Sequence, residues 1–462
     1  MTTVPVEILN SCDIRGTYPK PLGNPQAEQI GWSLGTLIKG ESHRNIKVIV
    51  GRDARHSSEN LHRSLIQGLR NTGLKIVDAG MVSSPLLAFS TRFSGASVGV
   101  MVTASHHPAD YNGFKFFVEG TPAPVSWIER LYGVLKSQIF RKGAGIVERK
   151  NFFPDYRNSL VNTIAQNFQG IKMVVDAGNG MAALTAPMVF EALHCDVKVL
   201  NEKLDGDFPG RGAASSDPQG LEVLGTIVRR EKAQIGVSFD GDGDGVSFVD
   251  EKGREIPNES ILCLFAKDLL IQNKNARVVY DAKCSDWVEK TVREAGGTAI
   301  IEKSGHTFIF SRMRKEKAFL GGEACGHFFL PGPFPGDSLY ATLRLLEILK
   351  GDPRSLSQMC SDFPSRVTTR DIEVEFSKEQ YQNVLEGLKS HAVEMGAQVS
   401  NLDGIRAVFK DGWGIVQPSV AGFFLSFRLE APTKTQLTKL ITEWFQGFPE
   451  IQQLILKRYA EF

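Results

Sequence analysis

The sequence predicts an α/β protein made of three similar α/β domains and a smaller C-terminal α+β domain. Its 462 residues suffice for three or four domains of roughly 100–200 residues each. An apolar, β-branched run that ends in turn residues occurs three times, and the last part of the chain follows a different pattern. Apolar residues make up 42% and charged residues 23%, a composition that is ordinary for a folded protein and excludes general disorder.

The repeated run identifies one strand in each expected α/β unit. It occupies residues 45–53, 171–180 and 276–285, and a stretch with helical periodicity follows, as at 286–295. An apolar strand, a tight turn and a helix are the unit of a parallel α/β layer. The similar intervals between the runs favour three domains, and one large doubly wound sheet is the alternative.

Turn-rich segments divide the chain. Gly143-Ala144-Gly145 precedes a helical stretch near 153–168, the turn at 252–257 precedes a helix that opens at Glu259, and the pattern changes after Pro364. Beyond that point we expect a strand, a helix and two further strand regions, which is an α+β pattern. These expected strands and this helix are 368–376, 378–394, 404–409 and 414–429, and the expected domains are 1–150, 151–253, 254–366 and 367–462.

Charge and cysteine usage exclude several classes of protein. Lys and Arg total 53 against 52 Asp and Glu, so no basic excess indicates a nucleic-acid partner or a membrane surface. No apolar run approaches the ~18 residues of a membrane span, and the N-terminus lacks the features of a secretory signal. The six cysteines form no C-x-x-C pair and are typical of free thiols. We therefore expect a cytoplasmic protein with no nucleic-acid or membrane partner.

A carboxylate loop follows the apolar run 235–239. Asp240, Asp242 and Asp244 alternate with glycines, which let the backbone curl so that the three carboxylates converge. Carboxylates that close repel one another unless a cation holds them. Oxygen ligands without His or Cys favour Mg²⁺ or Ca²⁺ over zinc.

The same loop also matches the calcium EF-hand pattern, with Glu251 as the final ligand. An EF-hand loop lies between two helices, whereas we expect strands at 235–239 and 246–249. The sequence therefore disfavours an EF-hand, and an acidic turn without a metal is the second alternative.

A serine loop follows the apolar run 98–102. Small residues precede Ser105, His106 and His107 come directly after it, and Lys115 lies ten residues on. A serine beside a base can act as a nucleophile, and the absence of a G-x-S-x-G elbow disfavours a hydrolase triad. A polar loop without catalytic function is the alternative.

The two loops together resemble those of the α-D-phosphohexomutase superfamily, closest to its phosphomannomutase/phosphoglucomutase branch. The resemblance covers nearly the whole chain. The matching segments are Asp13–Gly16, Val50–Arg55 with Ser57 and Ser58, Thr103–Pro108, Asn112–Lys115, Asp240–Asp244, Lys283–Ser285, Lys303–His306, Gly322–His327 and Asp411–Gly414.

This resemblance implies an isomerase that interconverts hexose 1-phosphate and hexose 6-phosphate, of mannose or glucose, by intramolecular phosphotransfer. It implies four domains around a central cleft, Mg²⁺ as cofactor, a phosphoserine enzyme, and hexose 1,6-bisphosphate as intermediate and activator. A sugar phosphate is then the partner, and we expect a monomer or weak dimer. The implied catalytic residues are Ser105, His106, Lys115 and Arg15, the metal ligands are Ser105, Asp240, Asp242 and Asp244, and the substrate-binding residues are Lys283, His306, Glu323, Cys325, His327 and Ser419.

The sequence departs from the family at four places. Gly245 replaces a basic residue, His107 an asparagine and Cys325 a serine. In the C-terminal phosphate loop, residues 417–422 read Gln-Pro-Ser-Val-Ala-Gly, and only Ser419 survives of the family's Arg, Ser, Asn and Thr. We expect weak phosphate anchoring there, unless another cation takes over: Arg406, Lys410 or Arg428.

Two other functions remain open at this point. One is a phosphoglucosamine mutase or another sugar-phosphate mutase. The other is a catalytically weak relative that binds a sugar phosphate.

Overall fold

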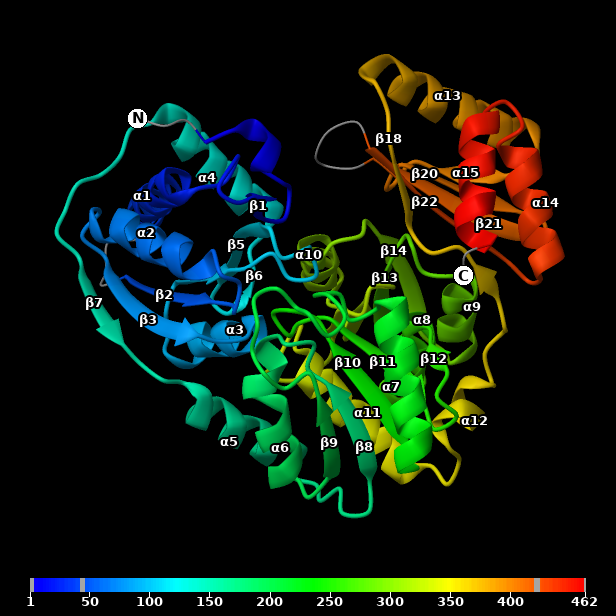
Figure 1. Ribbon diagram of the computed structural model, residues 1–462, viewed down its shortest axis with the longest axis horizontal. Helices are drawn as coiled ribbons and strands as arrows, with labels where there is room; N and C mark the ends of the chain where they lie inside the picture. Colours follow the sequence, from blue (N-terminus) through cyan, green and yellow to red (C-terminus); the bar gives the residue numbers. More distant parts are fainter. Residues whose placement is uncertain (1–3, 42–45, 419–423, 461–462) are drawn as a thin grey trace.

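The computed structural model describes residues 4–41, 46–418 and 424–460. It has four sheets, one in each successive part of the chain, with helices packed beside them (Figure 1). Three of these parts are α/β, and the fourth has an antiparallel sheet with its own helices. The predicted fold class is therefore confirmed.

The first sheet has the strand order β1-β5-β4-β2-β3-β7, with β6 paired to β5. Helices α1 and α2 cross in close contact, since a Cβ at Gly68 would collide with the backbone oxygen of Glu28. The elements are η1 (Val6–Ile8), β1 (Ile14–Thr17), α1 (Asn24–Glu41), β2 (Lys47–Arg52), α2 (Ser58–Arg70), β3 (Lys75–Met81), α3 (Ser84–Phe93), β4 (Val98–Val102), β5 (Tyr111–Val118), β6 (Thr121–Pro122), α4 (Val125–Ser137) and β7 (Ile146–Arg149).

The second sheet has the order β12-β11-β10-β8-β9. Its elements are α5 (Phe153–Ile164), β8 (Lys172–Asp176), η2 (Met181–Leu184), α6 (Ala186–Ala192), β9 (Asp196–Leu200), α7 (Pro218–Glu231), β10 (Ile235–Phe239), β11 (Val246–Asp250) and β12 (Glu255–Ile256).

The third sheet has the order β14-β13-β15-β16. Its elements are α8 (Asn258–Gln272), β13 (Arg277–Asp281), α9 (Trp287–Glu294), β14 (Thr298–Glu302), α10 (His306–Glu316), β15 (Leu320–Gly322), β16 (Phe328–Phe329), α11 (Ser338–Gly351) and α12 (Leu356–Cys360).

The fourth sheet has the order β17-β22-β21-β20-β19, with β18 also paired to β22, and every pairing in it is antiparallel. Its elements are β17 (Val367–Thr368), β18 (Ile372–Glu375), α13 (Lys378–Glu394), β19 (Gln398–Ser400), β20 (Ile405–Phe409), β21 (Gly412–Pro418), β22 (Phe424–Ala431), α14 (Lys434–Trp444) and α15 (Pro449–Ala460).

The three repeated runs occupy the same position in three sheets. They form β2, β8 and β13. Each is flanked by two parallel strands: β2 by β4 and β3, β8 by β10 and β9, and β13 by β15 and β14. In all three sheets the next strand along the chain, β5, β11 or β16, returns antiparallel beside β4, β10 or β15. One large doubly wound sheet is therefore wrong, and each sheet is mixed rather than purely parallel.

One strand was not expected, and one expected segment needs correction. Residues 146–149, within the expected first domain, form β7, which completes the first sheet beside β3. The expected strand at 368–376 is two strands, β17 and β18, which pair with different parts of β22. A single alternating pattern could not show that interruption.

Buried apolar side chains join the first three sheets into one core, to which each contributes, for example Met101, Val175 and Val278. The fourth sheet has a separate core, which includes Phe427 and Trp444. Among the described helices, none is both long and apolar enough to cross a bilayer.

Candidate active site

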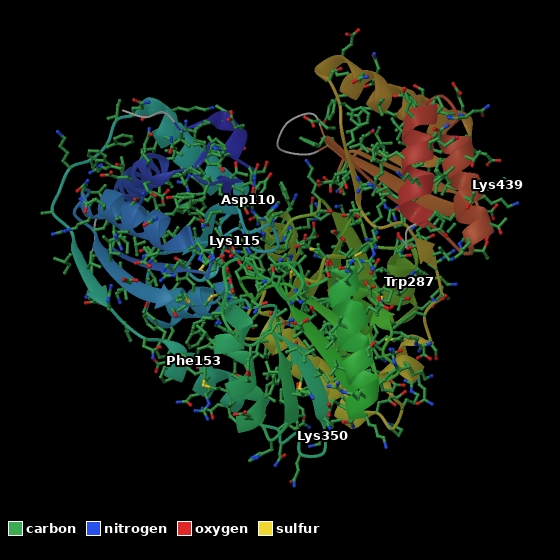
Figure 2. All side chains as sticks on the ribbon, in the orientation of Figure 1. Asp110, Lys115, Phe153, Trp287, Lys350 and Lys439 are labelled. Atoms are coloured by element: carbon green, nitrogen blue, oxygen red, sulfur yellow. The ribbon has the colours of Figure 1, made fainter. Side chains whose placement is uncertain are left out.

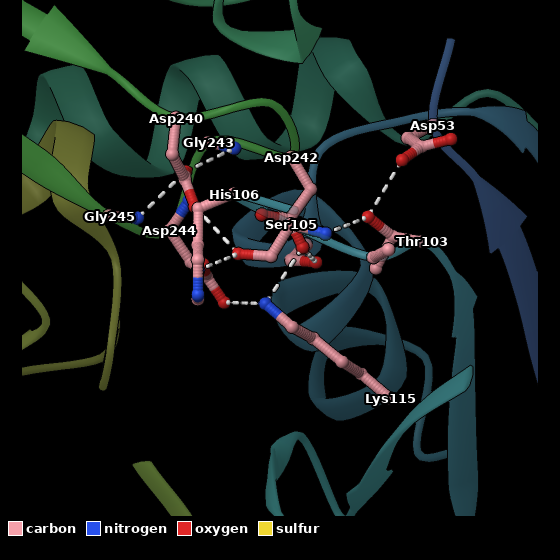
Figure 3. A network of polar contacts seen from close by, with 12 residues as sticks. Asp53, Thr103, Ser105, His106, Lys115, Asp240, Asp242, Gly243, Asp244 and Gly245 are labelled. Atoms are coloured by element: carbon pink, nitrogen blue, oxygen red, sulfur yellow. Dashed lines mark hydrogen bonds and ion pairs between the residues drawn. The ribbon is translucent and has the colours of Figure 1, made fainter. Parts of the chain in front are cut away.

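Three equivalent loops, one from each of the first three sheets, meet at one place. They join β4 to β5, β10 to β11 and β15 to β16, and they begin where a central parallel strand ends. Ser105 Oγ of the first loop donates to Asp240 Oδ2 of the second at 2.7 Å. His327 Nε2 of the third lies 3.1 Å from Asp244 Oδ1 of the second. The fold therefore brings the serine loop against the carboxylate loop (Figure 3), and His327 brings the third loop to the same carboxylates.

The serine loop is shaped by buried polar groups around Ser105. Ser105 has a positive φ of 53°, which few non-glycine residues adopt. Its backbone N–H donates to Thr103 Oγ1 at 2.9 Å, and the Thr103 hydroxyl donates to Asp53 Oδ2 at 2.7 Å (Figure 3). These bonds hold the loop in the conformation that presents Ser105 Oγ to the carboxylates.

Arg55 holds the same loop through hydrogen bonds to its backbone, and the sequence predicted no role for this residue. Its guanidinium donates to the carbonyl oxygens of Ser105 at 2.9 Å, His107 at 2.7 Å and Tyr111 at 3.1 Å, and also to that of Pro108. Its Nε lies 3.1 Å from Asp53 Oδ2. The signal that could have identified it is the matched segment Val50–Arg55, in which Asp53 and Arg55 form this buried pair.

Asp240 organises the carboxylate loop. Its Oδ1 accepts the backbone N–H groups of Gly243 at 3.0 Å, Asp244 at 3.1 Å and Gly245 at 2.9 Å (Figure 3). Gly243 has a φ of 78°, a conformation that favours glycine. Burial and the nearby Asp242 and Asp244 raise the pKa of Asp240 to about 7.

Lys115 supplies the counter-charge for the other two aspartates. Its Nζ lies 2.8 Å from Asp242 Oδ2 and 2.7 Å from Asp244 Oδ2, where the first sheet meets the other two (Figure 2). Burial alone would lower the pKa of Lys115, but the two carboxylates outweigh it and raise that pKa above its ordinary value. Lys115 is therefore an ammonium group at neutral pH.

The donor set fits a hard divalent cation. Asp242 Oδ1 is buried without a hydrogen-bond partner, although Oδ2 of the same carboxylate accepts from Ser84 Oγ at 2.6 Å. The carboxylates of Asp240 and Asp244 and the Ser105 hydroxyl add further oxygen atoms nearby. Oxygen donors of this kind suit Mg²⁺.

The EF-hand alternative is wrong. The loop lies between the antiparallel strands β10 and β11 rather than between helices. Glu251 points elsewhere, since its carboxylate accepts the Ser355 hydroxyl at 2.7 Å and the Ser357 backbone N–H at 3.1 Å. It therefore caps the start of α12 and is not a ligand of this loop.

His106 and Arg15 flank the serine. His106 Nδ1 lies 3.4 Å from Ser105 Oγ, and burial together with the Arg15 cation lowers the pKa of His106 well below its ordinary value. The imidazole is therefore neutral. Arg15 Nε lies 2.7 Å from Asp13 Oδ2, and Nη1 donates to Ala104 O at 3.5 Å, so this cation lies beside the serine loop.

The third loop brings Glu323, Cys325 and His327 to the carboxylates. Glu323 Oε1 accepts the Gly305 backbone N–H at 2.6 Å, and His327 Nδ1 lies 3.4 Å from Glu323 Oε2 and 3.2 Å from Cys325 Sγ. The His306 ring lies 6.3 Å from the His327 ring. Four of the expected substrate-binding residues thus lie together.

Of the other two expected substrate-binding residues, Lys283 lies apart from this group and Ser419 is not described. Lys283 Nζ lies 2.5 Å from Asp371 Oδ2, at the junction with the C-terminal part. Ser419 lies outside the described residues. Its neighbour Gln417 donates through Nε2 to Ser304 Oγ at 3.2 Å and to the Asp403 carboxylate.

The three cations considered as replacements for the lost arginine of the phosphate loop differ in what they contact. Arg406 donates to Ala282 O at 3.1 Å and lies over the Trp413 ring at 4.5 Å. Arg428 Nη2 lies 3.0 Å from Glu259 Oε1. Both guanidinium groups therefore already contact protein groups, whereas Lys410 is exposed.

Comparison with known proteins identifies the family. Residues 7–142, 151–253 and 257–367 match the families described as phosphoglucomutase/phosphomannomutase, alpha/beta/alpha domains I, II and III, respectively. A phosphomannomutase/phosphoglucomutase of Pseudomonas aeruginosa is 36% identical over 444 residues, which are 95% of each chain. A phosphoglucomutase of Neisseria gonorrhoeae is 32% identical over 95% of this chain and 96% of its own.

A solved structure agrees with these matches. The crystal structure of a phosphoglucomutase/phosphomannomutase family protein from Burkholderia thailandensis is 31% identical, covers 98% of both chains and superposes with a TM-score of 0.87. The chain therefore belongs to the phosphoglucomutase/phosphomannomutase family of the α-D-phosphohexomutase superfamily.

Proposed function

We propose that this protein is an isomerase that interconverts hexose 1-phosphate and hexose 6-phosphate, of mannose or glucose, through a phosphoserine at Ser105. The observation that carries the proposal is the contact between Ser105 Oγ and Asp240 Oδ2 at 2.7 Å, which joins loops of two sheets. The names of the relatives from Pseudomonas and Neisseria support mannose and glucose phosphates as substrates.

In the reaction, a sugar hydroxyl oxygen bonds to the phosphorus of phosphorylated Ser105 while the bond from phosphorus to Oγ breaks. The product is a hexose 1,6-bisphosphate, and the reverse reaction with its other phosphoryl group restores the phosphoserine. Mg²⁺ held by Asp240, Asp242 and Asp244 would neutralise charge on the phosphoryl group in transfer.

Proton transfer is assigned to residues beside the serine. The sugar hydroxyl loses a proton when its oxygen bonds to phosphorus. Ser105 Oγ takes up a proton when its bond to phosphorus breaks. Neutral His106, with Nδ1 at 3.4 Å from Oγ, can accept or donate a proton. Lys115, held as an ammonium group by two carboxylates, can donate one and supplies positive charge. Arg15 adds a second cation beside the loop.

Glu323 and His327 are proposed to hold the sugar hydroxyls. Glu323 is 3% exposed and its Oε2 has no hydrogen-bond partner, so a hydroxyl donor would satisfy a buried acceptor. A second candidate substrate is glucosamine phosphate, because a probable phosphoglucosamine mutase of Methanopyrus kandleri is 29% identical over 93% of this chain.

Phosphopeptide mapping tests the proposal. After incubation with glucose 1,6-bisphosphate, phosphate is expected on Ser105, and none is expected in Ser105→Ala. Coupled assays with mannose, glucose and glucosamine 1-phosphates then rank the substrates. Label on another serine with Ser105 bare would contradict the assignment, and labelled Ser105 without any turnover would favour a sugar-phosphate-binding relative.

Three finer expectations belong to the same proposal. They are a monomer or weak dimer, a cytoplasmic location, and domain boundaries near 150, 253 and 366. Light scattering, cell fractionation and limited proteolysis test them in turn.

A further inference from the structure

The loop between β15 and β16 carries a second set of metal-ligand atoms, distinct from the three aspartates. Glu323, Cys325 and His327 each offer one ligand atom, and these atoms lie within 4.8 Å of one another. His327 Nδ1 is the central atom, at 3.2 Å from Cys325 Sγ and 3.4 Å from Glu323 Oε2. Such spacings let one cation contact all three after small side-chain movements.

Glu323 provides an independent sign of a missing ligand. One of its oxygens accepts the Gly305 N–H at 2.6 Å, but the buried Oε2 accepts no hydrogen bond of good geometry, and its contact with His327 Nδ1 is long, at 3.4 Å. A buried carboxylate oxygen without a donor costs free energy, and a cation bound to it would remove that cost.

The Nε2 side of the His327 ring, which faces away from Cys325 and Glu323, has the kind of partner that metal-bound histidines have. Metal-bound histidines commonly donate their other ring N–H to a carboxylate, which fixes the tautomer and the ring orientation. His327 Nε2 lies 3.1 Å from Asp244 Oδ1 and can donate its N–H there, while Nδ1 on the other side of the ring faces Cys325 and Glu323 and would release its proton to solvent when a cation binds. Cys325 is exposed, which gives a cation access.

We propose that Glu323, Cys325 and His327 bind Zn²⁺ or another thiophilic divalent cation, with one position left open. A thiolate, an imidazole and a carboxylate form a donor set that suits zinc and does not suit Mg²⁺. On binding, the Cys325 thiol loses its proton to solvent as the sulfur–metal bond forms. A serine at position 325, which the family has there, would lack the thiolate.

Zinc at this site would inhibit the enzyme. Because Glu323 and His327 are proposed to hold sugar hydroxyls, zinc and sugar phosphate would compete for the same atoms. This consequence rests on the proposed function, whereas the metal site itself does not.

Cobalt is a suitable probe, because Co²⁺ bound to a thiolate has a near-ultraviolet charge-transfer absorption. The full chain is titrated with Co²⁺ in excess Mg²⁺, which keeps the aspartate loop filled. We expect one Co²⁺ per chain with this absorption, and displacement of the cobalt by Zn²⁺. Cys325→Ser should abolish the absorption and weaken zinc binding about tenfold or more, as loss of a ligand does.

Cys360→Ser is the matched control, because Cys360 is partly exposed and lies outside the loop, and it should keep the absorption. His327→Gln should lose tight binding as Cys325→Ser does. An absorption that is absent from the unmodified protein, or that persists in Cys325→Ser, would overturn the proposal. Either result would leave phosphate labelling of Ser105 unaffected, so failure of the zinc site and failure of the mutase function are distinguishable.

Discussion

Replacement of Arg55 tests how the serine loop is held. The Arg55 side chain is fully buried, pairs with Asp53 at 3.1 Å and donates to four carbonyl oxygens of the loop that carries Ser105. Arg55→Met keeps the length of the side chain, removes every donor and leaves Asp53 buried without its cation. Arg55→Lys keeps the charge but not the planar fork of donors.

The expected loss of stability follows from these contacts. A hydrogen bond from a charged donor contributes about 1.5–3 kcal/mol, and breaking a buried ion pair costs about 3–5 kcal/mol. These effects share one guanidinium group and do not add. We therefore expect Arg55→Met to lower the free energy of unfolding by ~3–5 kcal/mol, and Arg55→Lys to lower it by less.

Urea unfolding and steady-state kinetics measure the two consequences. A loop displaced by 1 Å can cost about a hundredfold in rate, so kcat should fall by about that factor while KM changes little. Arg52→Met is the matched control, because Arg52 is partly exposed and donates to the Asp53 backbone oxygen at 3.2 Å. Its loss should cost less than ~1 kcal/mol. Normal stability and kcat in Arg55→Met would refute this reasoning.

Three further predictions concern other parts of the chain. Asp242→Asn should lower activity and Mg²⁺ dependence together, whereas Glu251→Gln should leave metal binding intact and weaken the cap of α12 by ~1 kcal/mol, as calorimetry and thermal unfolding would show. Burial raises the pKa of Asp337 from 3.8 to about 6, so its stabilising contribution is complete below pH 3.8 and lost as the pH rises through 6. Asp337→Asn should therefore gain up to ~3 kcal/mol over the unmodified protein at pH 8 and nothing near pH 3.5, and an equal difference at both would contradict this. Gln417→Arg should lower the KM for hexose phosphates about tenfold or more by restoring a charged phosphate donor, and an unchanged KM would place the anchor elsewhere.

The sequence predicted those features that local pattern can carry. The runs that form β2, β8 and β13 were recognisable because they are apolar, β-branched and end in turn residues. The carboxylate loop was recognisable from its spacing alone. The equivalence of the three site loops was not, because it depends on strand order, and because β15 and β16 have only three and two residues. Periodicity cannot identify strands that short.

The charge balance of the site could not be predicted from the sequence either. The glycine at 245 suggested a lost cation, yet its N–H donates to Asp240, and a Cβ there would lie 3.1 Å from the Asp240 carboxylate. Room at this position is therefore limited by the carboxylate itself. The cations that balance the aspartates come from distant segments: Lys115, at 2.7 and 2.8 Å, comes from the first sheet, and His327, at 3.1 Å, comes from the third. A count of charges along the loop misses both, so whether the site keeps its function depends on contacts between sheets rather than on residue 245.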